Sequence, residues 1–554
     1  MPADPPEPTP GRRLTLSLAF GALALATVIS SGHRYANDFV FDDVHVIADG
    51  SVIHDPSNLV DIWTRHTMFA SVSDPGDGQA IDTYRPVPIT LFVVDAMVSG
   101  REPWAYHTTN LLLHLGCVWG VFLLALLWLD DRVAALYGAL VFAVHPWAVE
   151  AHVWINGRSD PACLLFGLAG MLALLHAERR GGHLRLSALS GFALLLGLLS
   201  KETLLLVFPA ILFMPAARGA TRSWRARLGP LLFAGLAYLG ARVAVLDGMR
   251  THRDTQMLFD AAAHLPWLLL DALRQTVAPE RPYLRSLSGE YADLLAWQIA
   301  LAAIVVVAVL TGAFLARKKA PLAAWTALWF FAPLLPISII STVLWPGFGR
   351  YLYVPLAGFG WLLASLTPVA RAKLPRKRLR VSLAALHVVL LAALAALFTR
   401  DLQSSEALYG AAMRARPAVA MPHGWLGMAL AREGDHRRAV VPLMRAAELD
   451  PSTHRYLIHA GRSVIALGQR EDAQLIAERG IHRFYGRPEE GAYHLLAVNA
   501  MTARDPTVAV GHLVRCLEVW PDRPDCAQAL EVMLEQAPDR VENQAALRAL
   551  LAEP

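Results

Sequence analysis

The chain has 554 residues, of which 55% are hydrophobic and 17% are charged, and its mean hydropathy is +0.39. This composition excludes an ordinary soluble globular protein and indicates a membrane protein with soluble parts. The formal net charge is only +4, and the basic residues lie in clusters between apolar segments. They therefore indicate membrane topology and argue against nucleic-acid binding.

The N-terminal region combines a proline-rich stretch, residues 1–13, with an apolar run over 14–31. A secretory signal peptide also has an apolar core, but this run is long and no clear small-x-small cleavage site follows it at the right place. We therefore expect 1–13 to be a disordered cytoplasmic tail and 14–31 to be an uncleaved first membrane span.

Apolar runs of about 20 residues are long enough to cross a bilayer as helices. Eleven such runs predict an all-α membrane domain over 14–400. They are 14–31, 106–129, 133–155, 161–177, 186–199, 203–217, 228–246, 294–315, 322–343, 351–369 and 381–398. The segment 264–277 is shorter and carries Asp271 and Arg274, so we expect it to be interfacial or re-entrant.

Basic residues collect in alternate loops, and such loops face the cytoplasm. The basic loops hold Arg12, Arg13, Arg132, Arg179, Arg180, Arg185, Arg218, Arg222, Arg225, Arg227, Arg317, Lys318, Lys319 and the segment 371–380. With eleven spans, the first outer loop, 32–105, and the C-terminal region then lie outside the cytoplasm. If 264–277 also crosses, the C-terminal region becomes cytoplasmic, but the basic loops argue against that alternative.

The first outer loop contains short amphipathic pieces. In 58–70, apolar and aromatic side chains recur at helical spacing, namely Leu59, Ile62, Trp63, His66 and Phe69. This pattern predicts a helix that lies on the membrane surface.

After residue 400 the composition becomes that of a soluble helical domain, and the segment contains an internal repeat. Gly434 and Gly468 are 34 positions apart, as are Ala439 and Ala473. A period of 34 with small residues at helix crossings is typical of tetratricopeptide repeats, in which helical hairpins stack into an α-solenoid. We therefore expect 401–554 to be an extracytoplasmic tetratricopeptide-repeat domain, and the number of repeats stays open.

The four cysteines form no metal-ligand pattern. Cys117 and Cys163 fall in apolar segments, where a small buried residue is the usual role. Cys516 and Cys526 lie symmetrically about Pro521, so a helical hairpin would allow them to pair in an oxidising compartment.

Two adjacent carboxylates, Asp42 and Asp43, follow the first span in the segment FVFDDVHVIA, residues 39–48. Carboxylates are costly near lipid and need a reason to be there. The ordinary interpretation is a solvated acidic turn. The alternative is a site for chemistry at the membrane surface.

Further polar groups fall on the same side of the predicted topology as Asp42. They are Tyr84, Arg85, the segment 103–110 with His107, His114, His145, Glu150, His152, Arg158, Asp160, Lys201, Glu202, Arg242, Arg350 and Tyr351. Each alone fits a satisfied surface residue, but that interpretation accounts poorly for so many on one side.

Together these groups suit glycosyl transfer from a lipid-phosphate sugar. A carboxylate at the water–lipid boundary accepts a proton from an alcohol, while nearby cations hold the anionic phosphate that leaves. Such a phosphate needs no general acid. A divalent metal stays an open alternative, although His145 and His152 are seven residues apart with Pro146 between them, which is a weak ligand pattern.

Five segments carry a resemblance to a known family, and they are FVFDDVHVIADG, YRPVPITLF, PWAYHTTNLLLHL, FAVHPWAVEAHVWINGRSD and LLSKETLLLVFP. They resemble the transmembrane and tetratricopeptide-repeat O-mannosyltransferases of the C-type glycosyltransferase superfamily. The resemblance is strong from the N-terminus up to about Leu212 and weaker from there to Val369. Beyond Val369 it lies in the architecture of the repeats alone.

The resemblance implies a C-type glycosyltransferase fold, a polyprenyl-phosphate-linked mannose donor, and transfer with inversion to Ser or Thr hydroxyls of a protein held by the repeats. It makes Asp42 the candidate general base, and Asp43 would orient the acceptor or the base. The candidates for the donor phosphate are Arg85, His107, Arg158, Lys201 and Arg242, with His145, Glu150, Asp160, Glu202 and Arg350 as further site candidates.

The chain has fewer repeats than animal members of this family, and its bias towards Ala, Arg and Leu indicates a bacterial member. We expect an inner-membrane protein with its site and repeats in the periplasm, which leaves the exact sugar and acceptor open.

Two other functions remain as alternatives. The same donor can serve a lipid or glycan acceptor, although tetratricopeptide repeats usually hold peptides. The chain can also be a noncatalytic membrane scaffold that displays repeats. A transporter is disfavoured because no matching pair of internally repeated spans with broken helices is evident.

Overall fold

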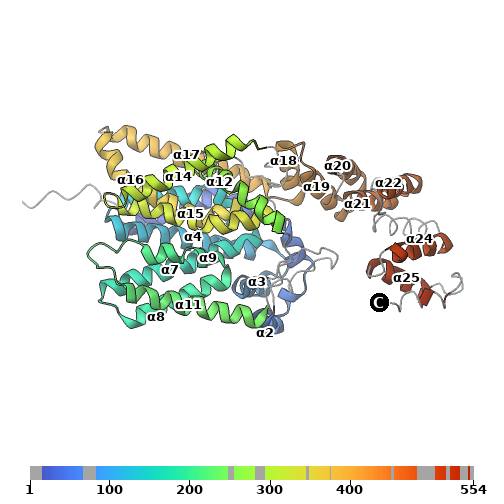
Figure 1. Ribbon diagram of the computed structural model, residues 1–554, viewed down its shortest axis with the longest axis horizontal. Helices are drawn as coiled ribbons and strands as arrows, with labels where there is room; N and C mark the ends of the chain where they lie inside the picture. Colours follow the sequence, from blue (N-terminus) through green and yellow to red (C-terminus); the bar gives the residue numbers. More distant parts are fainter. Residues whose placement is uncertain are drawn as a thin grey trace, which may run out of the picture. The chain divides into compact units, whose positions relative to one another are not determined.

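The computed structural model describes residues 15–65, 83–246, 255–280, 294–344, 349–374, 376–450, 455–482, 506–519 and 524–536, with Gln544, Leu547 and Arg548. The regular secondary structure of these residues is helical throughout, which confirms the predicted all-α class. The chain divides into two compact units, Met1–Ser404 and Ser405–Pro554, and helices of the first unit run alongside one another in Figure 1.

The first unit is built from long apolar helices with short elements between them. Its α-helices are α1 (Leu16–Ser31), α2 (Leu59–Thr64), α3 (Pro86–Ser99), α4 (Pro103–Leu129), α5 (Arg132–Val144), α6 (Pro146–His152), α7 (Ser159–Arg179), α8 (Leu184–Ser200), α9 (Thr203–Leu206), α10 (Phe208–Phe213), α11 (Trp224–Val245), α12 (Thr255–Val277), α14 (Ala296–Ala316), α15 (Pro321–Leu344), α16 (Tyr353–Lys373) and α17 (Lys377–Asp401). Its shorter helical elements are η2 (Gly32–Ala36), η3 (Val44–Ala48), η4 (Val52–His54), η5 (Pro56–Asn58), η7 (Ile155–Arg158) and η8 (Gly349–Leu352).

Seven helices within the described residues are long and apolar enough to cross a membrane, and the bent pair of α5 and α6 would make an eighth. The seven are Leu16–Ala36, Pro103–Leu129, Ile155–Arg179, Ala226–Val245, Ala296–Ala316, Gly349–Lys373 and Lys377–Asp401. The predicted spans at 186–199 and 322–343 correspond to α8 and α15, which count only as shorter apolar helices over their described parts.

Two of the eleven predicted spans are broken. The run 203–217 forms the short helices α9 and α10, because Val207 leaves helical geometry before Pro209. The run 133–155 bends by 62° between α5 and α6. His145 there is extended, as a residue before proline prefers to be.

The predicted interfacial segment 264–277 is the second part of the longer helix α12, and it is not among the candidate spans of the described residues. Its charged residues neutralise each other, since Arg274 Nη2 lies 3.0 Å from Asp271 Oδ1. The predicted amphipathic helix in 58–70 forms as α2 over Leu59–Thr64, and 66–70 lie outside the described residues.

Hydrogen bonds define one end of the membrane unit, called here the Asp42 end. Asn37, just after η2, donates through Nδ2 to the carbonyl oxygen of Thr399 in α17 at 2.9 Å. The backbone N–H of Asp38 donates to the carbonyl oxygen of Gln403 at 2.9 Å. The loop that carries Asp42 therefore lies at the same end of this unit as the end of α17 at Asp401, shortly before the second unit begins at Ser405.

The opposite end, called here the basic end, gathers the loops rich in arginine. Asp131 pairs with Arg371, and the neighbouring Asp130 pairs with Arg218 at 3.4 Å. Arg179 donates to the carbonyl oxygen of Arg218. Three of the arginines predicted to share one side of the membrane, Arg179, Arg218 and Arg371, thus lie at one end of the unit.

The core between α4, α5, α15 and α16 depends on close helix contacts. Four tryptophans, Trp128, Trp325, Trp329 and Trp361, pack with ring centroids between 5.1 and 5.6 Å apart. A Cβ atom placed on Gly138 would lie 2.2 Å from the carbonyl oxygen of Gly360. Glycine is therefore required where α5 crosses α16.

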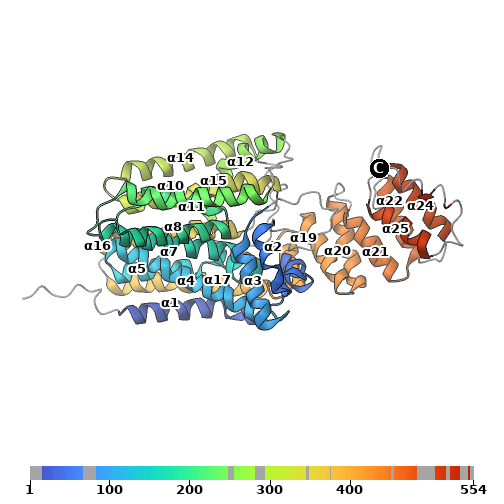
Figure 2. The ribbon, with the colours of Figure 1, turned by 90° about the horizontal axis from the view of Figure 1, so that it is seen from below.

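The described residues of the second unit form helical hairpins, as the internal repeat predicts (Figure 2). Its helices are α18 (Ser405–Ala415), α19 (Ala420–Arg432), α20 (His436–Leu449), α21 (Arg455–Ala466), α22 (Arg470–His482), α24 (Pro506–Val519) and α25 (Pro524–Gln536). Gly434 and Gly468 have φ values of +84° and +77° in equivalent turns, and Ala439 and Ala473 are both fully buried.

A disulfide joins Cys516 in α24 to Cys526 in α25, with their Cα atoms 6.5 Å apart. Both cysteines are buried in the core of this hairpin. Cys117 and Cys163 in the membrane unit are buried thiols.

Candidate active site

The loop before Asp42 has an unusual backbone. Phe41 has a φ of +54°, a region that costs an aromatic residue about 1–3 kcal/mol. Surrounding contacts stabilise it, because the Phe41 ring packs edge-on against Trp154 at 5.6 Å and Trp154 Nε1 donates to the carbonyl oxygen of Val40 at 3.3 Å. A short π-helix, η3, follows directly, and such helices are frequent at functional sites.

Asp43 is fully buried and fastens this loop to η7. Its Oδ1 accepts a hydrogen bond from the backbone N–H of Asn156 at 2.7 Å, and its Oδ2 accepts one from the N–H of Val40 at 3.3 Å. Burial raises the pKa of Asp43 to about 8, and the backbone hydrogen bonds oppose this rise. Asp43 therefore fixes the shape of the loop, while Asp42 is left partly exposed.

Asp42 lies between an amide and a guanidinium. Asn156 Nδ2 donates to Asp42 Oδ2 at 3.5 Å. Burial raises the pKa of Asp42 to about 6, while the charge of Arg350 and the hydrogen bond from Asn156 oppose that rise. A carboxylate with a pKa in this range is able to take up and release a proton near neutral pH.

Arg350 acts on Asp42, and Glu150 supports the element that carries Arg350. The guanidinium of Arg350 lies 4.6 Å above the ring of Trp154, and the Glu150 carboxylate accepts hydrogen bonds from the backbone of Gly349 and Arg350. A Cβ atom on Gly349 would lie 1.8 Å from the ring of Trp147. Glycine at 349 therefore allows η8, with Arg350, to approach α6.

Two ion pairs bring together four more of the predicted site residues. Arg85 holds Glu202 through both ends of its guanidinium, at 3.0 and 2.5 Å. The buried Lys201 donates to both oxygens of Asp160 at 2.7 Å, and its Nζ lies 5.0 Å from the ring of Tyr351. These cations are already neutralised by carboxylates, so a donor phosphate would have to compete with them.

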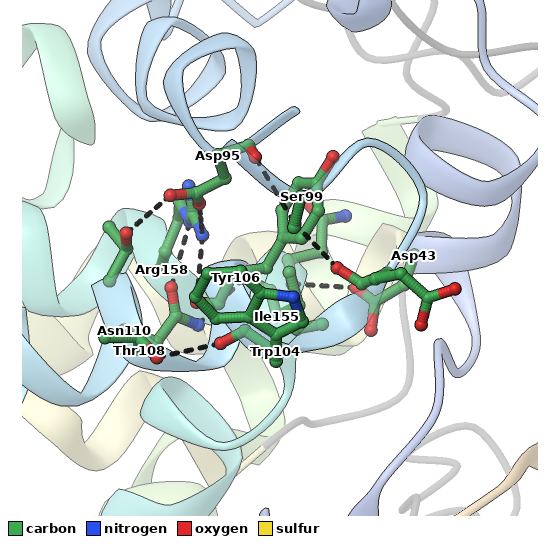
Figure 3. Close-up of polar contacts among 12 residues, drawn as sticks. Asp43, Asp95, Ser99, Trp104, Tyr106, Thr108, Asn110, Ile155 and Arg158 are labelled. Carbon is green, nitrogen blue, oxygen red and sulfur yellow. Dashed lines mark hydrogen bonds and ion pairs between the residues drawn. The ribbon is translucent and has the colours of Figure 1, made fainter. Parts of the chain in front are cut away.

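Arg158 occupies a buried polar centre (Figure 3). Its Nη2 lies 2.5 Å from Asp95 Oδ2, and its Nε donates to Asn110 Oδ1 at 2.9 Å. Phe92 covers the guanidinium at 4.0 Å, and the side chain has no solvent exposure. This arrangement gives no support to Arg158 as a ligand of the donor phosphate.

The two predicted histidines contact backbone carbonyl groups. His107 Nε2 lies 3.1 Å from the carbonyl oxygen of Asn37. His145 Nε2 lies 3.1 Å from the carbonyl oxygen of Thr276, and His145 Nδ1 accepts from the N–H of Trp147 at the start of α6. Both therefore support local structure, and His145 connects α12 to the bend between α5 and α6.

Arg242 lies in the last turn of α11 and donates to Tyr238 Oη at 3.2 Å. Tyr238 is within electrostatic reach of Glu202 and Arg85. Arg242 thus belongs to the same charged region as the Arg85 pair.

Sequence reasoning missed Arg34 and Asp95. Arg34 is buried just beyond α1 and contacts His152, and Asp95 is the buried partner of Arg158 in the apolar helix α3. A charged residue inside or beside an apolar segment is a signal of function or of a buried pair. That signal was present at both positions.

A metal centre finds no support in these side chains. Within the described residues, no group of three or more His, Cys, Asp or Glu side chains is arranged to hold an ion. Asp160 and Glu202 are engaged by Lys201 and Arg85. We therefore assign no step to a metal.

Comparison with known proteins finds a similarity in part of the membrane unit. Residues 86–247 match the family described as dolichyl-phosphate-mannose-protein mannosyltransferase. The fold is that of a polytopic membrane protein, and residues 86–247 of it are similar to this mannosyltransferase family. More particularly, part of the chain is similar to protein O-mannosyl-transferases of the TMTC group, the family that its motifs resemble.

Three of these relatives show the extent of the similarity. Tmtc1 of Drosophila melanogaster is 31% identical over 185 residues, or 33% of this chain and 21% of the relative. Human TMTC4 is 30% identical over 185 residues, 30% of this chain and 24% of the relative. Human TMTC1 is 32% identical over 224 residues, 36% of this chain and 24% of the relative. The similarity thus spans less than a quarter of each relative, and no solved structure matches the chain.

Proposed function

We propose that the protein transfers a monosaccharide, with mannose as the first candidate, from a polyprenyl-phosphate carrier to Ser or Thr hydroxyls of exported proteins. Two findings support this reaction class. The matching family is described as a protein mannosyltransferase that uses dolichyl-phosphate mannose, and the relatives are named protein O-mannosyl-transferases.

Asp42 is the general base of the proposed reaction. It takes the proton of the acceptor hydroxyl as the hydroxyl oxygen forms a bond to the anomeric carbon of the sugar. The bond from that carbon to the phosphate oxygen breaks, and its electron pair leaves with the polyprenyl phosphate. Attack from the face opposite the phosphate inverts the anomeric configuration.

Arg350 is the first candidate to hold the donor phosphate, and Arg242 is the second. Arg350 is partly exposed and acts electrostatically on Asp42, so a phosphate beside it would lie close to the base. A guanidinium offers a planar pair of donors that suits a phosphate. Arg85 and Lys201 would contribute less, since each already binds a carboxylate.

The second unit is the proposed holder of the acceptor, and its hairpins fit tetratricopeptide repeats in period. The end of α17 is hydrogen-bonded to the loop that carries Asp42, so we place both on one side of the membrane. Loops rich in arginine gather at the opposite end, which the positive-inside rule assigns to the cytoplasm. The disulfide between Cys516 and Cys526 fits an oxidising compartment such as the periplasm.

One observation carries the proposal: a partly exposed carboxylate, Asp42, lies between Asn156 and Arg350 at the Asp42 end with its pKa raised to about 6. A solvated surface aspartate would keep an ordinary pKa near 4. The arrangement instead suits a group that must gain a proton during each turnover.

The test uses the full-length protein in lipid nanodiscs with polyprenyl-phosphate mannose and a Ser/Thr-rich acceptor peptide. Asp42→Asn should abolish transfer while the protein stays folded and still binds donor. Asp61→Asn is the matched control, because Asp61 lies in the same outer loop and pairs only with its neighbour Arg65 among the contacts described. Unchanged turnover of Asp42→Asn would reject the proposed base, and hexose on lipid in place of peptide would reject the acceptor.

A further inference from the structure

The segment 152–158, between α6 and α7, is the part of the membrane unit that touches both aspartates. Asn156 supplies its backbone N–H to Asp43 at 2.7 Å and its side-chain amide to Asp42 at 3.5 Å. The position of Asp42 relative to its surroundings therefore depends on where this segment is held.

Arg34 holds the first residue of the segment. Its Nη1 donates to the carbonyl oxygen of His152 at 3.1 Å, and its Nη2 lies 3.0 Å from His152 Nδ1. The same guanidinium also donates to the carbonyl oxygen and hydroxyl of Ser31. The ring of His152 stacks on His114 at 3.8 Å, so the histidine is supported from its other face.

Arg158 and Asn110 hold the other end of the segment. Asn110 Nδ2 donates to the carbonyl oxygens of Trp154 and Ile155 at 3.2 and 3.0 Å. Asn110 Oδ1 in turn accepts from Arg158 Nε at 2.9 Å, and Arg158 Nη2 lies 2.5 Å from Asp95. Thr109 Oγ1 donates to the other oxygen of Asp95, so α3 and α4 both fix this end (Figure 3).

Both arginines are too buried to receive a lipid phosphate from outside. Arg34 is 1% exposed and Arg158 has no exposed area. Burying a guanidinium is costly unless its donors are satisfied. The described partners of Arg34 are all uncharged groups, and those of Arg158 include one carboxylate. The donors of Arg34 are directed at α1 and the 152–158 segment. Nε and Nη2 of Arg158 are directed at α3 and α4, while its buried Nη1 has no hydrogen-bond partner within the described residues.

We infer that Arg34 and Arg158 are positioning residues that fix the 152–158 segment, so that Asn156 holds Asp42 in its working position. This inference rests on the proposed function of Asp42. It assigns Arg158 a role other than phosphate binding and adds Arg34, which was not among the site residues predicted from the sequence. Loss of the contacts made by either arginine would displace Asp42, and small displacements at a reacting centre lower turnover steeply.

The variant Asp95→Asn distinguishes the two possible roles of Arg158, because positioning predicts a lower kcat and phosphate binding predicts tighter binding of polyprenyl phosphate. If Arg158 positions Asp42, loss of its carboxylate loosens the segment, and kcat falls about tenfold to a hundredfold while the KM for polyprenyl-phosphate mannose stays within about twofold. If Arg158 binds phosphate, removal of the competing carboxylate tightens binding of polyprenyl phosphate. Tighter binding with preserved kcat would overturn the inference.

The variants Arg158→Lys and Arg34→Lys extend the test, because lysine keeps the charge but loses the planar fork. Each should lower kcat in the same way with little change in donor KM. The acidic limb of the kcat profile should also move to higher pH. The groups that face Asp42 are Asn156, Arg350 and the neighbouring Asp43, and weakening the hydrogen bond from Asn156 raises the pKa of Asp42.

Glu178→Gln is the matched control for a buried ion pair. Glu178 pairs with Arg227 at 2.8 Å with both side chains fully buried, but this pair lies near the basic end. The variant should lower the melting temperature as Asp95→Asn does, yet leave kcat and the pH profile unchanged. If both variants lower kcat equally, the effect is one of general stability and the inference fails.

The two proposals fail separately. If Asp42→Asn keeps full activity, the proposed base is wrong whatever Arg158 does. If Asp42→Asn is inactive but Asp95→Asn and Arg34→Lys raise only donor KM, the base stands and the positioning role is wrong.

Discussion

The acidic pair Asp42 and Asp43 is held differently from the carboxylates at the basic end of the membrane unit. At the basic end, Glu178 receives two hydrogen bonds from Arg227, and Asp131 receives a guanidinium from Arg371. At the Asp42 end, three other carboxylates also pair with cations. The hydrogen bonds described for Asp43, however, come from backbone N–H groups, and the one described for Asp42 is a long one from an amide.

This contrast shows that the surroundings of Asp42 and Asp43 are less favourable to charged carboxylates than those at the basic end. A carboxylate with a direct cation keeps its charge easily, whereas a buried carboxylate without one resists ionisation. The Asp42 end also carries the positive φ of Phe41. Backbone strain and buried carboxylates without a direct cation both destabilise the fold, and such features cluster at functional sites. We therefore relate the Asp42 end to function, and the ion pairs at the basic end to topology and stability.

The largest expected effect is that of Asp42→Asn, which removes the base. We expect kcat to fall by about 10²–10⁴-fold, the usual contribution of general base catalysis. Single-turnover transfer of radiolabelled mannose to peptide measures this loss. A fall in kcat of similar size in Glu178→Gln would show that the loss is not specific to Asp42.

The second effect concerns Arg350→Gln, which keeps a hydrogen-bond donor but removes the charge next to Asp42. We expect the donor KM to rise about tenfold to a hundredfold, as for loss of a charge-assisted hydrogen bond. Titration of polyprenyl phosphate by thermal shift provides an independent readout. Arg371→Gln at the basic end serves as the control, and equal weakening in both variants would contradict the assignment.

The third effect is a dependence on pH. Since the pKa of Asp42 is raised to about 6, the base is ionised above this pH and protonated below it. Transfer should therefore fall by about tenfold per unit as the pH drops below 6, as for any single essential base. Measurement of kcat/KM from pH 4.5 to about 8 shows this limb, and a profile flat through 6 would exclude Asp42 as the titrating group.

The smallest effect is that of Arg218→Ala at the basic end. The pair of Arg218 with Asp130 is largely exposed, and exposed pairs contribute less than about 1 kcal/mol. We expect a nearly unchanged melting temperature and unchanged transfer. A large loss of activity would show that the basic end also takes part in the reaction.

The sequence indicated much of this architecture. Apolar runs marked α1, α4, α7, α11, α14, α16 and α17, because the length and apolarity of a span are local properties. The 34-residue period marked the equivalent hairpins of the second unit. The bend at His145 was also readable in principle, since Pro146 restricts the residue before it.

The candidate site was only partly readable. Asp42 stood out because a carboxylate close to an apolar run is costly, and it does lie beside Arg350. The charge of Arg158 gave no sign of its partner, since Asp95 is 63 positions away in another helix. The same holds for Lys201 and Asp160, 41 positions apart. A sequence shows which cations exist but not which are already neutralised.

The sequence by itself therefore determined the membrane class, the helical hairpins, the family resemblance and the acidic pair, because each depends on composition, spacing or short motifs. Only the tertiary structure decided that Asp43 fixes the loop while Asp42 stays accessible, and that Arg34 and Arg158 are buried. The physical reason is that burial and charge pairing depend on neighbours distant in sequence, which helix packing alone brings together.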